Sequence, residues 1–305
     1  MAFEHPYFAA MRFFQFWTYL TPRTIWRAIQ AAGQQRLPGL AAEMAYNSML
    51  ALFPAVLALL TAVGLFKDVG GTLMELAAQL SRFAPKEVLY LLEGFIKEIS
   101  NTQSQSLFSI SFVVSIWAAS GALSAAMVAL DHIQQTPSNQ MRPFWKAKLV
   151  SLGLTVGTIL LLLIASLLVF VSDLIVNYAA HRSGDFQPWL LIAWRLLRWL
   201  LAFGIVAIAF AFIYRFGPSR WHRGTPILPG AILSAIFWAV LSGLFRLYVS
   251  QFGTYNKAYG AVGAVIVLLL WLYLTSLVLL MGNQLNHTIG EAMHHDRRYR
   301  RLRTR

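Results

Sequence analysis

Long apolar runs alternate with polar connections along the chain. Six of these runs carry few charges, and each is near the roughly 20 residues that a helix needs to cross a bilayer. Backbone N–H and C=O groups find no water in hydrocarbon, so such runs must form helices. The pattern predicts an all-α polytopic membrane protein with six transmembrane helices, at residues 40–66, 107–130, 149–172, 190–214, 229–249 and 259–281.

Two further segments are amphipathic. Residues 67–106 place apolar side chains at helical spacing, which predicts two amphipathic helices on or near the outer surface. Residues 1–39 combine aromatic residues with arginines, as is typical of a helix at headgroup level. We therefore divide the chain into an interfacial N-terminal segment (1–39), a six-helix transmembrane domain (40–286, including 67–106) and a basic tail (287–305).

Composition supports a membrane location. Hydrophobic residues make up 58% of the chain and charged residues 12%, so polar side chains are too few to cover a water-facing surface of this size. The net charge of +13 indicates nucleic acid or anionic lipid as a neighbour, and the placement of the charges decides between them. The absence of cysteine excludes disulfides, thiolate metal sites and a cysteine nucleophile.

The placement of Lys and Arg predicts the topology. Sixteen of them precede, follow or connect the apolar runs on the side that holds both termini, and six lie on the other side. By the positive-inside rule, both termini are cytoplasmic. The basic tail is then expected to anchor the topology at the anionic leaflet, with specific lipid or RNA binding as the less favoured alternative. Its arginines are Arg297, Arg298, Arg300, Arg301, Arg303 and Arg305.

Three arginines fall inside predicted spans, where a charge is expensive and therefore informative. Arg195 and Arg198 are neighbours on one face of the fourth span, and Arg246 lies near the outer end of the fifth. Guanidinium groups bind phosphate and carboxylate oxygens in a bidentate way, so the three predict an outer-leaflet site for an anionic headgroup. Alternatively, each extends to the interface or pairs with Asp173.

The first span is polar at its cytoplasmic start. Glu43 is followed one turn later by Tyr46 and Asn47, and Pro54 interrupts the middle of the run. Proline removes a helix hydrogen bond and permits a kink, so these four residues predict a helix that lines a cavity or gates it. The alternative is that Glu43 only binds helix N-terminal amides or a cytoplasmic arginine.

Two shorter features have a packing or a functional explanation. The external connection at 251–257 includes Tyr255 and Asn256 beside the outer arginines, and it either closes over a headgroup or only turns the chain. Gly153 and Gly157 form a small-xxx-small pair, which predicts close helix packing.

Catalytic motifs are poorly represented. His294 and His295 follow Glu291 at helical spacing, which suits a metal, but no second ligand cluster accompanies them. The sequence contains no Walker A loop, no GxSxG elbow and no HExxH motif. We therefore predict no enzyme, no metal and no cofactor.

Four stretches resemble the YihY/BrkB family of bacterial inner-membrane proteins: Leu40-Ala-Ala-Glu-Met-Ala-Tyr46 running to Pro54, Arg142-Pro-Phe-Trp-Lys146, residues 248–273, and Gly282-Asn-Gln-Leu-Asn286. The resemblance implies six spans in the bacterial inner membrane. Members of this family carry an old ribonuclease BN label and an association with virulence or serum resistance. Export of lipids or lipopolysaccharide precursors has been suggested for them, so the resemblance implies these functions as expectations. Relatives usually carry a glutamate where this chain has Gln284, so a role that needs that carboxylate is lost here.

The leading hypothesis is transport or flipping of an anionic lipid or other amphiphile through a cavity between the helices. The expected partners are membrane lipids, such as anionic phospholipid or a lipid A-like molecule, and not nucleic acid. A non-catalytic membrane scaffold is the main alternative. Ribonuclease activity is a remote one, because phosphodiester cleavage needs clustered carboxylates or histidines.

Overall fold

The computed structural model describes residues 18–65, 105–182, 188–220, 225–252 and 256–303, and these form helices joined by short connections. No strand occurs among them, so the all-α prediction is confirmed. The predicted outer helices at 67–106 and the first 17 residues lie outside the described part. The helices are α2 (Pro22–Gln34), α3 (Leu37–Leu65), α6 (Gln105–Ile133), α7 (Phe144–Arg182), α8 (Pro188–Phe216), α9 (Leu228–Phe252) and α10 (Asn256–Arg303), with a short 3-10 helix η3 (Ser138–Gln140) before α7.

Five helices of the described part are long and apolar enough to cross a membrane: α6, α7, α8, α9 and α10. Helix α3 covers the remaining predicted run, although its side chains beyond Leu52 lie outside the described residues. The multi-pass prediction therefore holds for five runs, and the sixth stays a prediction.

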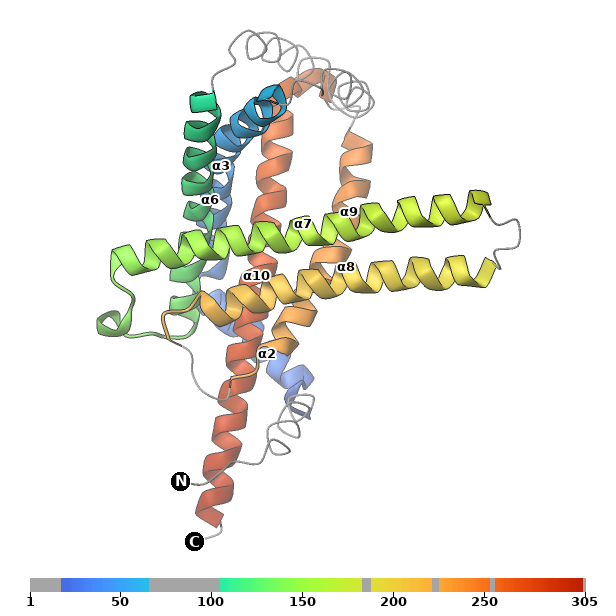
Figure 1. Cartoon of the computed structure of the whole chain (residues 1–305). Helices are drawn as coiled ribbons and strands as arrows, with labels where there is room; N and C mark the ends of the chain where they lie inside the picture. The colour runs from blue at the N-terminus through green and yellow to red at the C-terminus, as the bar shows by residue number, and fades with distance from the viewer. Residues whose placement is uncertain (1–17, 66–104, 183–187, 221–224, 253–255, 304–305) are drawn as a thin grey trace, which may run out of the picture.

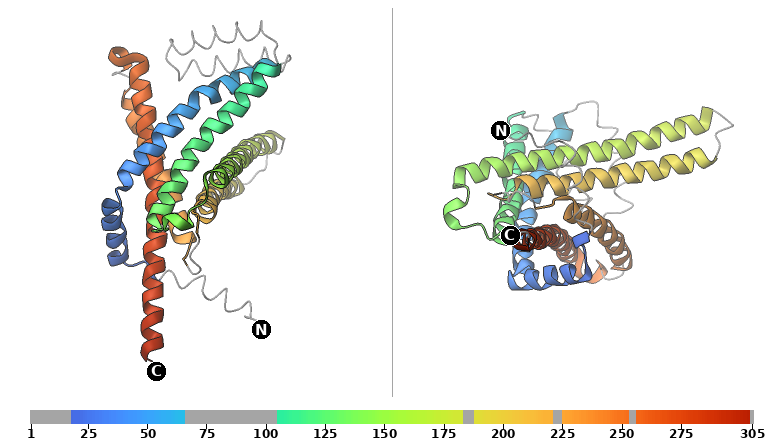
Figure 2. Two further views of the ribbon diagram at one scale, coloured as in Figure 1. Left: turned by 90° about the vertical axis from the view of Figure 1, so that its left-hand side faces the viewer. Right: turned by 90° about the horizontal axis from the view of Figure 1, so that it is seen from below.

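The spans do not form one parallel bundle. Helices α3 and α6 lie side by side next to α10 and α9, whereas α7 and α8 form a hairpin that crosses them and projects away (Figures 1 and 2). Helix α7 has 39 residues, about 58 Å, which exceeds the ~30 Å hydrocarbon core. A helix of that length must tilt strongly or extend beyond the core.

Helix α2 is the amphipathic helix expected in the N-terminal segment. Thr21 caps it by accepting a hydrogen bond from the Thr24 amide at 3.3 Å, and Pro22 follows at the first helical position. The face of α2 that carries the small residues Ala28 and Ala32 is buried, and Ala28 packs with Leu285 and other α10 residues. This contact packs α2 against α10 at Leu285, Ile289 and Met293.

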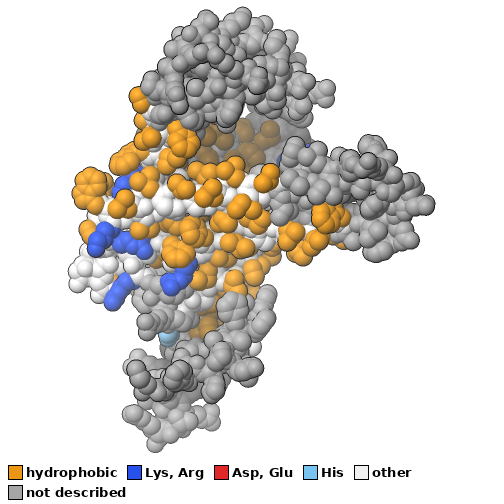
Figure 3. Space-filling view, viewed as in Figure 1, with side chains coloured by type: hydrophobic (Ala, Val, Ile, Leu, Met, Phe, Trp, Pro, Cys, Tyr) orange, Lys and Arg blue, Asp and Glu red, His pale blue; other side chains and the backbone are white. Residues whose placement is uncertain are grey.

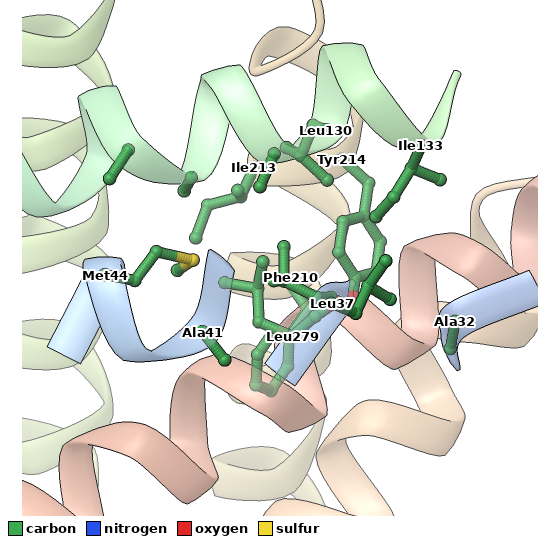
Figure 4. Packing of buried hydrophobic residues seen from close by; sticks show 14 of the residues in the cluster. Ala32, Leu37, Ala41, Met44, Leu130, Ile133, Phe210, Ile213, Tyr214 and Leu279 are labelled. Carbon is green, nitrogen blue, oxygen red and sulfur yellow. The ribbon is translucent and has the colours of Figure 1, made fainter. Parts of the chain in front are cut away.

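The core gathers at the starts of α3 and α9, the ends of α6 and α8, and the middle of α10 (Figure 4). It is built from many small side chains, which let the helix backbones approach closely. The larger fully buried members are Leu37, Leu130, Ile133, Tyr214 and Leu280.

Glycines show where that approach is tightest. An added Cβ at Gly157 would overlap the Phe212 ring, so the predicted close packing occurs there between α7 and α8. Gly153 faces open space instead. An added Cβ at Gly282 would overlap Ser234 and Tyr214, so α8, α9 and α10 meet at this glycine.

The predicted basic tail does not begin a new element. Helix α10 continues without a break from Asn256 to Arg303, well past the apolar run, and its end projects away from the other helices (Figure 1). Its side chains beyond His294 lie outside the described residues.

Candidate functional site

The three predicted headgroup arginines are placed only in part. Arg195 and Arg198 lie on α8, but their side chains are outside the described residues. Arg246 is exposed on α9. Helices α8 and α9 lie close together near Phe216 and Leu228 and separate toward their other ends (Figure 1). A shared outer site therefore stays a prediction.

The predicted gating residues of α3 divide into two groups. Glu43 and Tyr46 are exposed, and no hydrogen bond of either side chain is found within the described residues. Asn47 is half-buried, and its Nδ2 donates to the Glu43 carbonyl at 2.9 Å. An added Cβ at Gly121 would lie 3.3 Å from Asn47 Oδ1, so Asn47 belongs to the contact between α3 and α6.

The remaining predicted gating residues have little described geometry. The α3 backbone is helical on both sides of Pro54, whose side chain is outside the described part. Tyr255 lies outside the described residues altogether, and Asn256 is the first residue of α10. Their gating role is untested.

Lys148 lies in the first turns of α7 and contacts α6. Its Nζ donates to Ser120 Oγ at 2.6 Å and to the Trp117 carbonyl at 3.3 Å, and lies 4.2 Å from the centre of the Trp117 ring. Ser120 precedes the end of α6 at Ile133 by 13 residues, about 20 Å along the helix. The ammonium group therefore lies beside the middle of a membrane-spanning helix.

A basic and aromatic surface surrounds this lysine. Lys146 is exposed two residues before Lys148 on α7, and Arg215 is exposed in the last turn of α8. Phe144 and Trp145 are 71% and 73% exposed. Figure 3 shows Lys and Arg side chains gathered where α7 begins and α8 ends, beside apolar side chains that cover the hairpin. Exposed aromatics and cations together are typical of the headgroup region.

A hydrogen-bonded junction joins the two connections on this side. Asp131 Oδ1 accepts from the Ser219 amide and its Oδ2 from the Ser219 hydroxyl, each at 2.6 Å. Arg142 donates to the carbonyls of Gly217 at 2.7 Å, Pro218 at 2.7 Å and Phe216 at 3.1 Å. These carbonyls end α8 and lack helical partners, and a cation there also suits the helix dipole. The α6–α7 connection is thus bound to the end of α8.

The charge state of Arg142 does not change in this junction. Burial lowers the pKa of Arg142, and the Asp131 carboxylate raises it in part. A guanidinium is effectively always protonated in proteins, so Arg142 keeps its charge. Its donors are therefore always available to the α8 carbonyls.

Two polar residues join the core helices. The Tyr214 hydroxyl of α8 donates to the Leu279 carbonyl of α10 at 2.7 Å and lies 2.8 Å from Ser234 Oγ of α9. Asn286 of α10 accepts from the Gly230 amide at 2.7 Å and donates to the Ile227 carbonyl at 3.0 Å. Asn286 therefore satisfies a free amide at the start of α9.

The two amides before Asn286 are also buried. Asn283 and Gln284 are each 1% exposed, and Asn283 Nδ2 and Gln284 Oε1 have no hydrogen-bond partner in the described part. At position 284, where the family resemblance leads us to expect a carboxylate, a neutral amide avoids a buried negative charge.

Sequence reasoning missed these contacts. Arg142 entered the sequence analysis only through its charge and the family resemblance, and no motif singled out Lys148 or Asp131. The described residues hold no group of three or more His, Asp or Glu side chains that suits a metal ion. The His295 side chain is outside that part, so the prediction of no metal stays untested.

Comparison with known proteins gives consistent matches. Residues 28–305 match the family described as virulence factor BrkB. A putative ribonuclease-like protein, YfkH of Bacillus subtilis (strain 168), is 29% identical over 249 residues, which cover 80% of this chain and 87% of the relative. A UPF0761 membrane protein of Tolumonas auensis is 26% identical over 286 residues, covering 87% and 84%. No solved structure matches.

Proposed function

We propose that this chain, which belongs to the virulence factor BrkB family, moves an anionic lipid or other anionic amphiphile between the leaflets of the bacterial inner membrane. The observation that carries the proposal is Lys148, a cation held beside the middle of α6. A charge in a membrane span is costly and commonly marks the route of a substrate or ion.

The hydrogen bonds of Lys148 leave room for a ligand. An ammonium group has three donors, and two acceptors for it, Ser120 Oγ and the Trp117 carbonyl, lie within the described residues. The third donor is available for a phosphate or carboxylate oxygen. The Trp117 ring and Ser120 hold the ammonium in place, so little further ordering is needed when a headgroup binds.

The surroundings suit the rest of an amphiphile. Apolar residues on α6, α7 and α8 are exposed to lipid, among them Val114, Leu163 and Leu200. A headgroup attracted by the cationic surface at the start of α7 can reach Lys148 while its acyl chains stay in hydrocarbon. Arg195, Arg198 and Arg246 would then receive the headgroup at the opposite leaflet, with both termini cytoplasmic.

Liposomes with headgroup-labelled phosphatidylglycerol test the proposal. The protein should accelerate exchange of the label between leaflets, and Lys148→Met should slow exchange at least fivefold. Lys146→Met is the comparison on the same helix: it removes one of several exposed cations and leaves Lys148 in place, so it should slow exchange less than twofold. The double variant Arg198→Ala with Arg246→Ala should also slow exchange. Equal rates with and without protein would remove the transport function.

A membrane scaffold is the alternative. It would leave lipid exchange flat in liposomes while a stoichiometric protein partner is recovered by crosslinking in cells. The name of the Bacillus subtilis relative raises ribonuclease activity, and highly purified protein that cuts tRNA, and loses cutting with Glu291→Ala, would support it. Neither result is expected if Lys148 serves lipid movement.

A further inference from the structure

A small apolar groove lies between the interfacial helix α2 and the spans α9 and α10. It has a volume of about 250 Å³. Its lining includes Ile25 and Ile29 of α2, Ser234 and Phe237 of α9, and Leu277 and Leu285 of α10. It extends about 12 Å along α10, from Leu277 to Leu285.

The polar atom in the groove wall is already satisfied by the protein. Ser234 Oγ donates to the Val278 carbonyl at 3.1 Å and lies 2.8 Å from the Tyr214 hydroxyl. A buried water needs two to four polar partners, and apolar cavities of roughly 150 Å³ stay dry and bind hydrocarbon. The groove is therefore suited to an apolar ligand.

The faces of α2 place the groove at the edge of the bilayer. Ile25 and Ile29 line the groove and are 39% and 46% exposed, while Arg23 and Arg27 fall on the opposite face by helical spacing and are exposed. Arg36 is exposed at the turn into α3, and residues 18–42 contain no acid. Such a helix lies with its apolar face toward hydrocarbon and its arginines among anionic headgroups.

We infer that this groove binds one acyl chain of an anionic phospholipid in the leaflet on the side of the termini, with the headgroup at the level of Arg23 and Arg27. The charge of α2 complements an anionic headgroup, and the volume suits part of one chain rather than a whole lipid. The site concerns binding alone, so it holds whether or not the chain moves lipid between leaflets.

Photocrosslinking tests the inference. Protein in nanodiscs is irradiated with phosphatidylglycerol that carries a diazirine in its acyl chain, and crosslinked peptides are mapped by mass spectrometry. Crosslinks should concentrate in the parts of α2, α9 and α10 that line the groove. Ile25→Trp with Ile29→Trp should fill the groove mouth and reduce these crosslinks at least fivefold.

A second pair of tryptophan substitutions controls for the size of the introduced side chains. Ile236→Trp with Val240→Trp places the same change on exposed α9 residues outside the groove wall, and should alter the crosslinks less than twofold. Crosslinks spread evenly over the apolar surface of the wild-type protein would overturn the site without any variant. In a separate assay, an oxidant-induced disulfide between two copies that each carry Ile29→Cys would overturn the lipid as occupant, because the wild-type chain has no cysteine.

The headgroup part has its own test. Phosphatidylcholine with the same acyl diazirine should give at least threefold fewer groove crosslinks than phosphatidylglycerol. Arg23→Gln with Arg27→Gln should remove that difference. Equal crosslinking of both lipids by the wild-type protein would contradict the anionic preference. Loss of groove crosslinks in the tryptophan pair with normal lipid exchange would separate this site from the transport route through Lys148.

Discussion

The two ends of the helix assembly differ in how they are held. At the end near the termini, core side chains are buried and hydrogen bonds join α6, α7, α8, α9 and α10 across their connections. Toward the other end, apolar residues of α7, α8 and α9 such as Leu163, Leu200 and Leu244 are exposed. Among the described residues, the hydrogen bonds that join different helices therefore gather at one end of the assembly.

The physical reason lies in the solvent. In hydrocarbon, apolar side chains gain little from one another over lipid, so association depends on close packing and hydrogen bonds. The junctions near the termini supply both through Gly282, Tyr214, Asn286 and Arg142. The α7–α8 hairpin has its close contact at Gly157, and its orientation is set mainly where it begins and ends.

Glycine substitution should show the largest contrast between the two ends. Gly282→Ala places a Cβ into Ser234 and Tyr214, and overpacking of this kind costs about 3 kcal/mol. Gly243→Ala on α9 meets nothing within 4 Å and should be neutral or stabilise by up to about 1 kcal/mol through helix propensity. Thermal unfolding in detergent measures the stability of both variants. Equal losses of stability in the two would contradict the difference between the two ends.

Removing the hydrogen bonds of Arg142 to the end of α8 should have the next largest effect on stability. Arg142→Ala leaves the carbonyls of Phe216, Gly217 and Pro218 without their charged donor, and the loss should be about 2 kcal/mol. Arg220→Ala is the matched control on the neighbouring connection, where the arginine is exposed, and it should cost less than about 1 kcal/mol. If Arg142→Ala unfolds at the same temperature as the wild-type protein, these hydrogen bonds do not stabilise the contact between the α6–α7 connection and the end of α8.

The smallest effect is expected at the buried hydroxyl. Tyr214→Phe keeps the ring but removes the donor to the Leu279 carbonyl, which should cost about 1 kcal/mol. A double-mutant cycle with Ser234→Ala should show coupling, because the two hydroxyls are in contact. Additive losses would mean that the three-helix junction depends on shape and not on these hydrogen bonds.

The helix pattern could be predicted from sequence because apolar length is a local property. The fourth predicted span, 190–214, lies inside α8, and the fifth, 229–249, lies inside α9. The contacts of the site could not be predicted in this way. Arg142 binds backbone carbonyls more than 70 residues away, and backbone acceptors leave no signature in side-chain type.

Lys148 illustrates the same limit more sharply. Its sequence context is that of a charge at the start of a span, and only the crossing of α7 over α6 brings its amine beside Ser120. The predicted arginine site depends on side chains of Arg195 and Arg198 that lie outside the described residues, so it stays a prediction.

Helix α10 continues for several turns past the core. From Met281 to Arg303 it extends about 33 Å without interruption. A tilt of about 10° at Met281 would therefore displace its far end sideways by roughly 6 Å. A spectroscopic label near Arg303 would report such a tilt as a change in its distance from a second label on α2.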